Sequence, residues 1–239
     1  MTQRLIAAVP LLLLAGCDFE QPNSGCIVQD SASWILKYDE VQKATDDVCV
    51  ANKRFAPVGE LAGIFKYIDL EKGGDSTLAI RPDGLSSRGA RDNVTNQREQ
   101  TAFGDLNLQQ DAQYFCSAGD LSVAKVDAVA REAVPGKDGK PGISAEEPKK
   151  LAYAFTHVKV YSAPSAPGTQ FSADLEYTDN GCTSTYKVRG MWPAVACTPG
   201  SEVPALSCGQ GSGVNPDFAV VCDPTLKLCV LEKDVPSLK

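Results

Sequence analysis

Histidine is almost absent from this chain of 239 residues, which has one His against nine Cys. The Cys-x₂-Cys spacing typical of structural zinc sites is also missing, and one imidazole cannot supply the usual His ligands. No apolar run approaches the roughly 18 residues that a membrane-spanning helix needs. The sequence therefore predicts no metal, no cofactor and no transmembrane helix.

Positively charged residues are fewer than negatively charged ones: the chain has 23 Lys and Arg and 30 Asp and Glu, which gives a net charge of −7. An acidic surface argues against binding to nucleic acid and against electrostatic attachment to anionic lipid head groups. We therefore expect no nucleic-acid partner. Any attachment to a membrane has to come from something other than charge.

The first residues have the organisation of a secretory signal. Arg4 supplies a positive start, Leu5–Leu14 forms the apolar run, and two small residues, Ala15 and Gly16, precede Cys17. The apolar run is too short to span a bilayer. The sequence thus indicates export, and residues 1–16 are expected to be removed as a signal peptide.

The four residues Leu14-Ala15-Gly16-Cys17 resemble the lipobox of bacterial lipoprotein precursors. The resemblance implies that Cys17 carries a diacylglyceryl thioether, that cleavage occurs before it, and that its new amine is acylated. Lipidation at Cys17 would anchor the protein to a bacterial membrane, on the periplasmic side or at the cell surface. Asp18 resembles the signal that retains some lipoproteins in the inner membrane. An ordinary signal peptide with a nearby cysteine is the alternative.

Without residues 1–16, the chain has 223 residues and a net charge of −8, because Arg4 is the one charged residue removed. This length suffices for one large domain or two small ones. Residues 17–25 are predicted to form a polar tether whose extended length is under roughly 30 Å. We expect a β-rich globular domain over 26–200 and a Cys-rich hairpin segment over 201–239 packed on it.

With Cys17 assigned to lipid, the other cysteines are even in number, which in an exported chain indicates four disulfides. The candidates are Cys26, Cys49, Cys116, Cys182, Cys197, Cys208, Cys222 and Cys229. Their connectivity stays open. Sequence proximity favours Cys26 with Cys49, and Cys208 with either Cys222 or Cys229.

Alternating apolar and polar residues indicate strands through most of the chain. Strands are expected at residues 34–38, 60–70, 77–81, 102–108, 121–129 and 153–161, with a tail hairpin at 218–221 and 228–231. A short helix or irregular loop is expected within 39–50, and another short helix within 82–90. Residues 135–148, rich in Gly, Lys and Pro, are predicted to form the longest surface loop.

The strongest local prediction is a hairpin of residues 171–178 and 183–189. Asn180-Gly181 lies between them, and both central residues of a type I′ turn need positive φ. Centring the turn there pairs Thr178 with Thr183 and Asp174 with Lys187 on a polar face. Leu175 then pairs with Tyr186 on an apolar face, and a slip of one residue would exchange the faces.

Two features invite a catalytic interpretation. Gly74-Asp75-Ser76 resembles the Gly-Asp-Ser-Leu motif of a serine esterase family, in which a later Asp-x-x-His supplies the base. Here Ala154 stands three residues before His157, so the partner motif fails. A Ser hydroxyl without a base is a poor nucleophile. A Gly73-Gly74-Asp75 hairpin turn before Ser76, and a surface or half-buried packing position for His157, are therefore the expectations.

Asp105-x-Asn107-x-Gln109-x-Asp111 has the spacing of the first ligands of a calcium loop. The glycine at the sixth position is missing, and Cys116 stands where the bidentate Glu should be. A polar turn is the favoured interpretation.

We expect a mainly β fold, an antiparallel sandwich or curled sheet with one or two short helices, stabilised by disulfides. The favoured function is a membrane-anchored lipoprotein of the cell envelope that binds another envelope protein or a glycan, or is structural, without catalysis. The alternative is an extracytoplasmic hydrolase whose catalytic residues come from separate loops. A concave site with two convergent titratable residues would favour the hydrolase.

Overall fold

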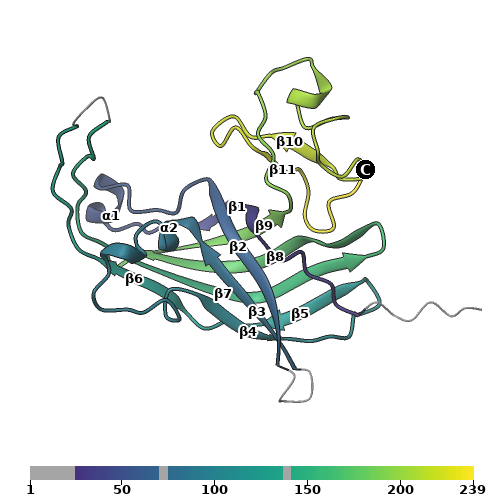
Figure 1. Cartoon of the computed structure of the whole chain (residues 1–239), viewed down its shortest axis with the longest axis horizontal. Helices are drawn as coiled ribbons and strands as arrows, with labels where there is room; N and C mark the ends of the chain where they lie inside the picture. The colour runs from purple at the N-terminus through teal and green to yellow at the C-terminus, as the bar shows by residue number, and fades with distance from the viewer. Residues whose placement is uncertain (1–24, 70–74, 137–140) are drawn as a thin grey trace, which may run out of the picture.

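The structure is a computed structural model that describes residues 25–69, 75–136 and 141–239 (Figure 1). The predicted signal peptide, Cys17, the tether up to Ser24 and the Gly73-Gly74 turn lie outside the described residues. The elements in chain order are β1 (Ser31–Gln42), α1 (Asp47–Ala51), β2 (Gly59–Asp69), β3 (Asp75–Pro82), α2 (Asp83–Ser86), η1 (Gly89–Arg91), β4 (Ala102–Leu106), β5 (Phe115–Gly119), β6 (Ala124–Ala128), β7 (Lys149–Ala163), β8 (Ala166–Asp179), β9 (Cys182–Met191), η2 (Pro204–Leu206), β10 (Val220–Cys222) and β11 (Cys229–Leu231).

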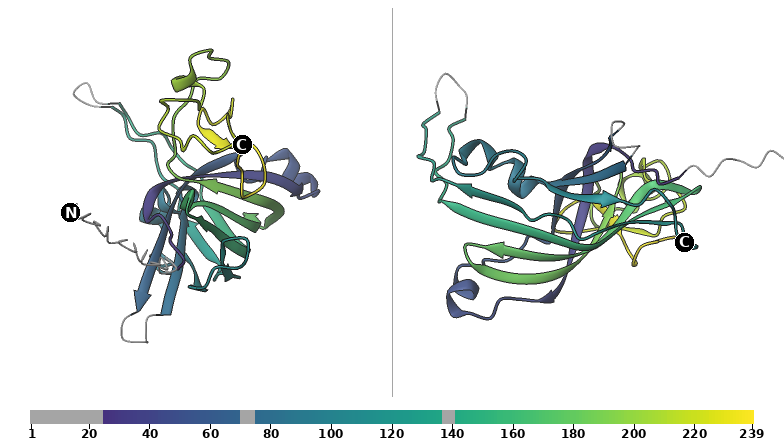
Figure 2. Two further views of the ribbon diagram at one scale, coloured as in Figure 1. Left: turned by 90° about the vertical axis from the view of Figure 1, so that its right-hand side faces the viewer. Right: turned by 90° about the horizontal axis from the view of Figure 1, so that it is seen from below.

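The main sheet is antiparallel throughout and has the order β4-β3-β2-β1-β9-β8-β7-β5, with β6 also paired to β7. The sheet curls until its two edges meet (Figure 2). Asn107 N donates to Ser117 O at 2.9 Å and Ser122 N to Phe103 O at 2.8 Å, which joins the β4 edge to the region of β5. The predicted mainly β fold is confirmed, in its curled-sheet form.

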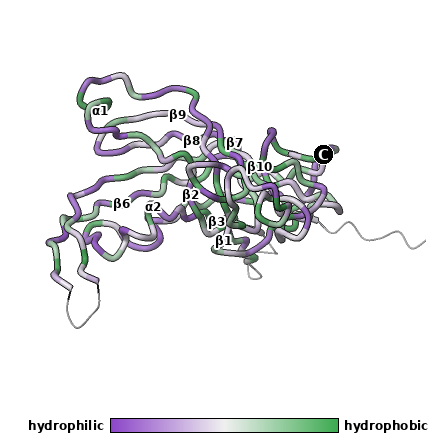
Figure 3. Tube along the Cα trace, turned by 90° about the horizontal axis from the view of Figure 1, so that it is seen from above, coloured by the Kyte–Doolittle hydropathy of each residue, from purple (hydrophilic) through white to green (hydrophobic). Residues whose placement is uncertain are grey.

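The hairpin of β8 and β9 has the predicted register. Thr178 pairs with Thr183, Leu175 with Tyr186 and Asp174 with Lys187. Asn180 and Gly181 have φ of 47° and 87°, the positive values that the turn requires. Figure 3 shows hydrophobic and hydrophilic residues mixed along these strands, in keeping with one buried and one exposed face.

The inner face of the curled sheet holds the larger core. Trp34 and Leu36 of β1, Phe155 of β7, and Phe171 and Leu175 of β8 are among its fully buried side chains. These residues alternate with outward-facing ones because successive side chains of a strand point to opposite faces. The closed shape thus follows from burying one face of every strand against the others.

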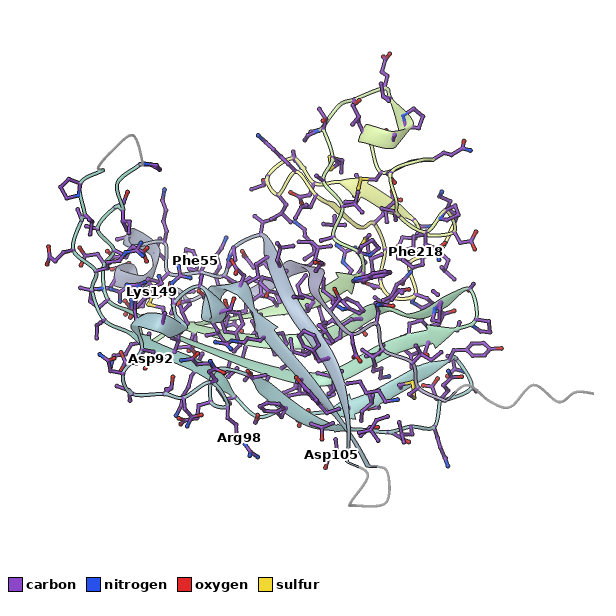
Figure 4. The ribbon with its side chains drawn as sticks, viewed as in Figure 1. Phe55, Asp92, Arg98, Asp105, Lys149 and Phe218 are labelled. Atoms are coloured by element: carbon purple, nitrogen blue, oxygen red, sulfur yellow. A yellow bond between two sulfur atoms is a disulfide. The ribbon has the colours of Figure 1, made fainter. Side chains whose placement is uncertain are left out.

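A second core lies on the outer face of the sheet. Ile35, between the inward Trp34 and Leu36, packs instead with Met191 and Phe218. Phe218, labelled in Figure 4, belongs to the C-terminal segment, residues 194–239, which Figure 1 shows above the sheet. This segment contains β10 and β11, which pair close to the predicted positions.

The eight candidate cysteines form four disulfides: Cys26–Cys116, Cys49–Cys182, Cys197–Cys222 and Cys208–Cys229. The suggested pairing of Cys26 with Cys49 is wrong. Cys49 lies on α1, which sits near the start of β9, whereas Cys26 precedes β1 and lies beside β5. Cys208 pairs with Cys229, one of the two partners that the sequence left open.

The segment 39–50, expected to be a helix or loop, is part strand and part helix. β1 continues to Gln42 because it pairs with β9 as far as Thr185, although its pairing with β2 ends at Lys37, and α1 then begins after Asp46. The Asp46 side chain accepts a hydrogen bond from Val48 N at 2.9 Å, which caps the helix. Among the described residues, none of the helices combines the length and the apolarity needed to cross a bilayer.

Candidate functional site

The point at which the chain enters the fold is held by covalent and hydrogen bonds. Cys26 is buried, bonded to Cys116, and its N–H donates to Leu108 O at 3.2 Å. The Gln110 side chain donates to Gly25 O at 2.8 Å and to Ser162 O at 2.7 Å. The chain is therefore fixed to the fold from its first described residues.

The next residues continue this attachment across the ends of β7 and β8. Ile27 N donates to Ser162 Oγ at 3.0 Å, and Gln29 N donates to Gly168 O at 2.9 Å. A Cβ on Gly168 would come within 2.2 Å of Ile27 O, so this close approach requires glycine. We call residues 25–29 the entry strap.

Beside the entry strap, a hollow of about 490 Å³ opens where the sheet meets the C-terminal segment. Its lining residues are Pro167, Thr169, Trp192, Pro193, Gly211, Gly213, Val214, Asn215 and Pro216. Trp192 N donates to Thr169 O at 3.0 Å, which holds this residue against β8. A half-buried aromatic ring among prolines, with a few polar groups, has the composition of a binding site.

Ser76 does not have the surroundings of a nucleophile. It lies on β3, opposite Leu106 of β4, and its side chain is buried. Its hydroxyl has no hydrogen-bond partner, so no base is in position to take its proton. The structure therefore does not bring Ser76 together with His157.

His157 lies on the outer face of β7 and is 77% exposed. Its Nδ1 is 3.1 Å from Asp174 Oδ2, and Lys187 Nζ is 2.5 Å from Asp174 Oδ1. The hydrogen bond from Lys187 lowers the pKa of Asp174 from its ordinary value. The three side chains line an open hollow of about 470 Å³ together with Ser172. Titratable groups therefore do converge in a concave surface site, but in the described part of the chain no hydrogen bond joins the Ser172 hydroxyl to His157, whose ring contacts Asp174 instead.

The Asp105–Asp111 segment forms a polar turn. Asn107 Oδ1 accepts from Gln109 N, and Asp111 Oδ1 accepts from Gln113 N and Phe115 N, each at 2.9 Å. These side chains satisfy the backbone of their own loop. In the described parts of the chain, the cluster of metal-binding atom types is the sulfurs of Cys197, Cys208 and Cys222, which disulfides already occupy.

Sequence reasoning missed a carboxylate in the inner core. Glu60 Oε1 accepts from the hydroxyls of Tyr38 at 3.0 Å and Tyr153 at 2.9 Å, and Oε2 accepts from Gly84 N at 2.5 Å. Burial raises the pKa of Glu60, while these hydrogen bonds act in the opposite direction. Burial also raises the pKa of Tyr38 and that of Tyr153.

The contacts of Glu60 join four elements: β1, β2, β7 and the start of α2. Its partners are distant in the sequence, so no local spacing signals the cluster. With three donors on one carboxylate, the arrangement cross-links the inner core.

Comparison with known proteins identifies the family. The model of the MlpA family matches residues 32–193, which run from β1 to just beyond β9. The chain belongs to the MlpA family. It is 43% identical over 235 residues to a Myxococcus xanthus protein named "Putative lipoprotein MlpA", across 95% of this chain and 93% of that relative. No solved structure matches the chain.

The name of the relative supports the lipoprotein resemblance seen at Leu14–Cys17, and the family match covers the folded domain from β1 to β9. The family model leaves residues 194–239 outside its match. The domain boundary predicted at residue 200 stays a prediction.

Proposed function

We propose that the protein is a lipid-anchored component of a bacterial cell envelope that binds another envelope component, a protein or a glycan, without catalysing a reaction. The anchor is the acylated Cys17. The relationship to a protein named as a lipoprotein supports this assignment, as does the lipobox-like sequence. The membrane, inner or outer, and the side are left to experiment.

The observation that carries the proposal is the entry strap. The chain enters the fold nine residues after Cys17 and is immediately held by the Cys26–Cys116 disulfide. A lipid on Cys17 would thus hold the globular domain within roughly 30 Å of the membrane. Acyl chains contribute about 0.8 kcal/mol per buried CH₂, so anchoring needs no basic surface.

Lipidation is tested by mass spectrometry of protein extracted from membranes, with Cys17→Ala as the comparison. We expect the acyl mass on the mature protein to be lost in the variant, and the variant to appear in the soluble fraction. Cys26→Ala is unsuitable as a control because that residue is buried and disulfide-bonded. An intact mass that is the same with and without the substitution would contradict the anchor.

The binding role is assigned to the hollow that Trp192 lines. A sugar ring has apolar C–H faces and hydroxyls at its edge, which suit a tryptophan ring beside polar groups such as Thr169 and Asn215. Soluble peptidoglycan fragments are the first probe, with binding followed by isothermal titration calorimetry, a readout that does not depend on the tryptophan being replaced.

We expect Trp192→Ala to lose most of the binding and Trp192→Phe to keep part of it. Leu206→Ala, an exposed position of η2 in the same C-terminal segment, is the matched control and should bind normally. Binding that is equal in all three variants would remove the hollow from the proposal. Turnover of a substrate by the purified mature protein in a broad hydrolase screen would contradict the non-catalytic role.

A further inference from the structure

The entry strap lies at one particular end of the curled sheet. Lys66 near the end of β2 donates from its Nζ to Cys26 O at 2.7 Å, and its N–H donates to Asp30 Oδ1 at 2.6 Å. Leu108, which accepts from Cys26 N, follows the end of β4. The strap therefore lies against the last part of β2 and against the segment that follows β4.

The register of the sheet brings a third connection to this end. β7 ends where Ala163 pairs with Ala166 of β8, and Ser162 next to this turn accepts from Ile27 N. Ser162 N also donates to Tyr114 O at 2.9 Å, which joins this turn to the segment between β4 and β5. The end of β2 with the paired start of β3, the β4–β5 connection and the β7–β8 turn thus share one end of the sheet with the entry strap. We call this end the entry end.

The entry end carries exposed side chains that are large and apolar or aromatic. They are Ile27, Tyr67, Ile68, Leu108 and Tyr114. Tyr67 and Tyr114 are 56% and 48% exposed, and they are the only tyrosines among the large exposed hydrophobics of the described residues. Tyrosine is enriched at the level of lipid head groups, because its ring is apolar and its hydroxyl remains hydrated.

The opposite end has a different composition. Its exposed apolar residues include Val48 on α1, Val94 after η1, and Val134 in the long loop. Figure 1 shows α1, α2 and β6 together at that end, and Figure 4 places Asp92 there and Asp105 near the entry end. Small β-branched side chains without aromatic rings present little surface to a membrane.

We propose that the entry end contacts the bilayer interface directly, with Tyr67, Tyr114 and their apolar neighbours at head-group depth. The proposal rests on the lipid anchor at Cys17, since the nine-residue distance from the anchor to Cys26 keeps this end near the membrane. It adds a fixed orientation: the entry end faces lipid, and the end with α1 and α2 faces away. Because the protein is acidic, the contact depends on apolar burial, gains nothing from anionic lipid, and is insensitive to salt on phosphatidylcholine vesicles, which carry no net charge.

The test uses the full acylated protein in phosphatidylcholine vesicles that contain brominated acyl chains, which quench nearby tryptophan. Tyr114→Trp and Tyr67→Trp place a reporter at the entry end. Val94→Trp places one at the opposite end, where Val94 is 73% exposed. Quenching is measured in excess of that of the unsubstituted protein, which has a buried Trp34 and a half-buried Trp192, and near-UV circular dichroism checks the fold.

We expect both entry-end reporters to lose most of their added emission on brominated vesicles, and Val94→Trp to keep its emission, at low and at high salt. Equal quenching of all three reporters, or of none, on vesicle-bound protein would overturn the proposal while leaving the anchor intact. Reporters shielded from iodide but not quenched by lipid would show that a protein partner or a second copy covers this end instead. Protein that does not float with vesicles would remove the anchor and the proposal together.

Discussion

Removal of the Cys26–Cys116 disulfide should destabilise the protein more than removal of Cys197–Cys222. The first bridge joins residues 90 apart and the second joins residues 25 apart. A disulfide stabilises mainly by restricting the unfolded chain, and the restriction grows with the length of the loop it closes. Both changes are made as paired Cys→Ala substitutions, so that no free thiol remains.

The magnitudes follow from the loops that each bridge closes. For Cys26–Cys116, the remaining Cys49–Cys182 bridge offers no shorter path, and loop closure contributes roughly 4–5 kcal/mol. For Cys197–Cys222, the neighbouring Cys208–Cys229 bridge already shortens the loop, which leaves about 3 kcal/mol. The burial of the cysteines increases the difference between the two stability losses, because Cys26 and Cys116 are fully buried whereas Cys222 is half-buried.

Urea unfolding at neutral pH, followed by circular dichroism, measures both losses, with slopes compared to check that the unfolded states are alike. The entry strap should stay protected from hydrogen exchange at Ile27 and Gln29 in the Cys26→Ala/Cys116→Ala variant, because their amides keep their acceptors. A larger loss for the Cys197–Cys222 pair would refute the loop argument. Peptide mapping that joins Cys26 to another cysteine would refute the pairing itself.

Three further changes test the packing and the electrostatics. Burial acts to raise the pKa of Asp92, but hydrogen bonds from the Thr95 side chain and from backbone amides lower it to about 2. The Asp92 carboxylate therefore stabilises the fold fully above its pKa in the unfolded chain, which is near 4, and this stabilisation is lost as the pH falls through about 2. Asp92→Asn should lower the free energy of unfolding by about 1–2 kcal/mol at pH 7 and by little at pH 2, measured by urea unfolding at both pH values. Gly84→Ala would place a Cβ 2.3 Å from the Tyr153 hydroxyl; it should displace that hydroxyl from Glu60, lower stability by about 1–3 kcal/mol and raise the tyrosine absorbance change on unfolding, and an unchanged Tm would argue against the Glu60 cluster. Phe155→Ala in the inner core should cost about 3–5 kcal/mol in the same unfolding assay, and a loss below about 1 kcal/mol would show that the curled sheet is not closed around it.

The β8–β9 hairpin shows why part of the fold is readable from sequence. Asn180-Gly181 sets the turn, and the alternation of Leu175 and Tyr177 with polar residues sets the register, so both signals lie within a few residues of each other. The same holds for the tail hairpin. Where the local signal was weak, as in residues 39–50, pairing of β1 with β9 extended the strand to Gln42, beyond its expected end.

The candidate site was less accessible to sequence reasoning because its parts are remote from one another. The hollow beside Trp192 combines residues near 167 with residues near 213, and they meet only because the C-terminal segment packs on the outer face of the sheet. For the two rejected catalytic residues, in contrast, the sequence alone already argued against a catalytic role. Ser76 and His157 could be doubted from the failed motif alone, and the structure adds that Ser76 is buried without a base.

The sequence by itself indicated what depends on near neighbours: the resemblance of residues 1–17 to a secretory signal with a lipobox, the even number of cysteines besides Cys17, the strand alternation and the turn at Asn180-Gly181. Only the tertiary structure decided which cysteines pair, that Glu60 is held by Tyr38 and Tyr153, and that the ends of β2, β4 and β7 gather around the entry strap. The physical reason is that turns and strand faces follow from short-range backbone geometry. Disulfide partners and buried hydrogen bonds follow from the closure of the sheet, which brings together residues whose separation along the chain carries no information about their separation in space.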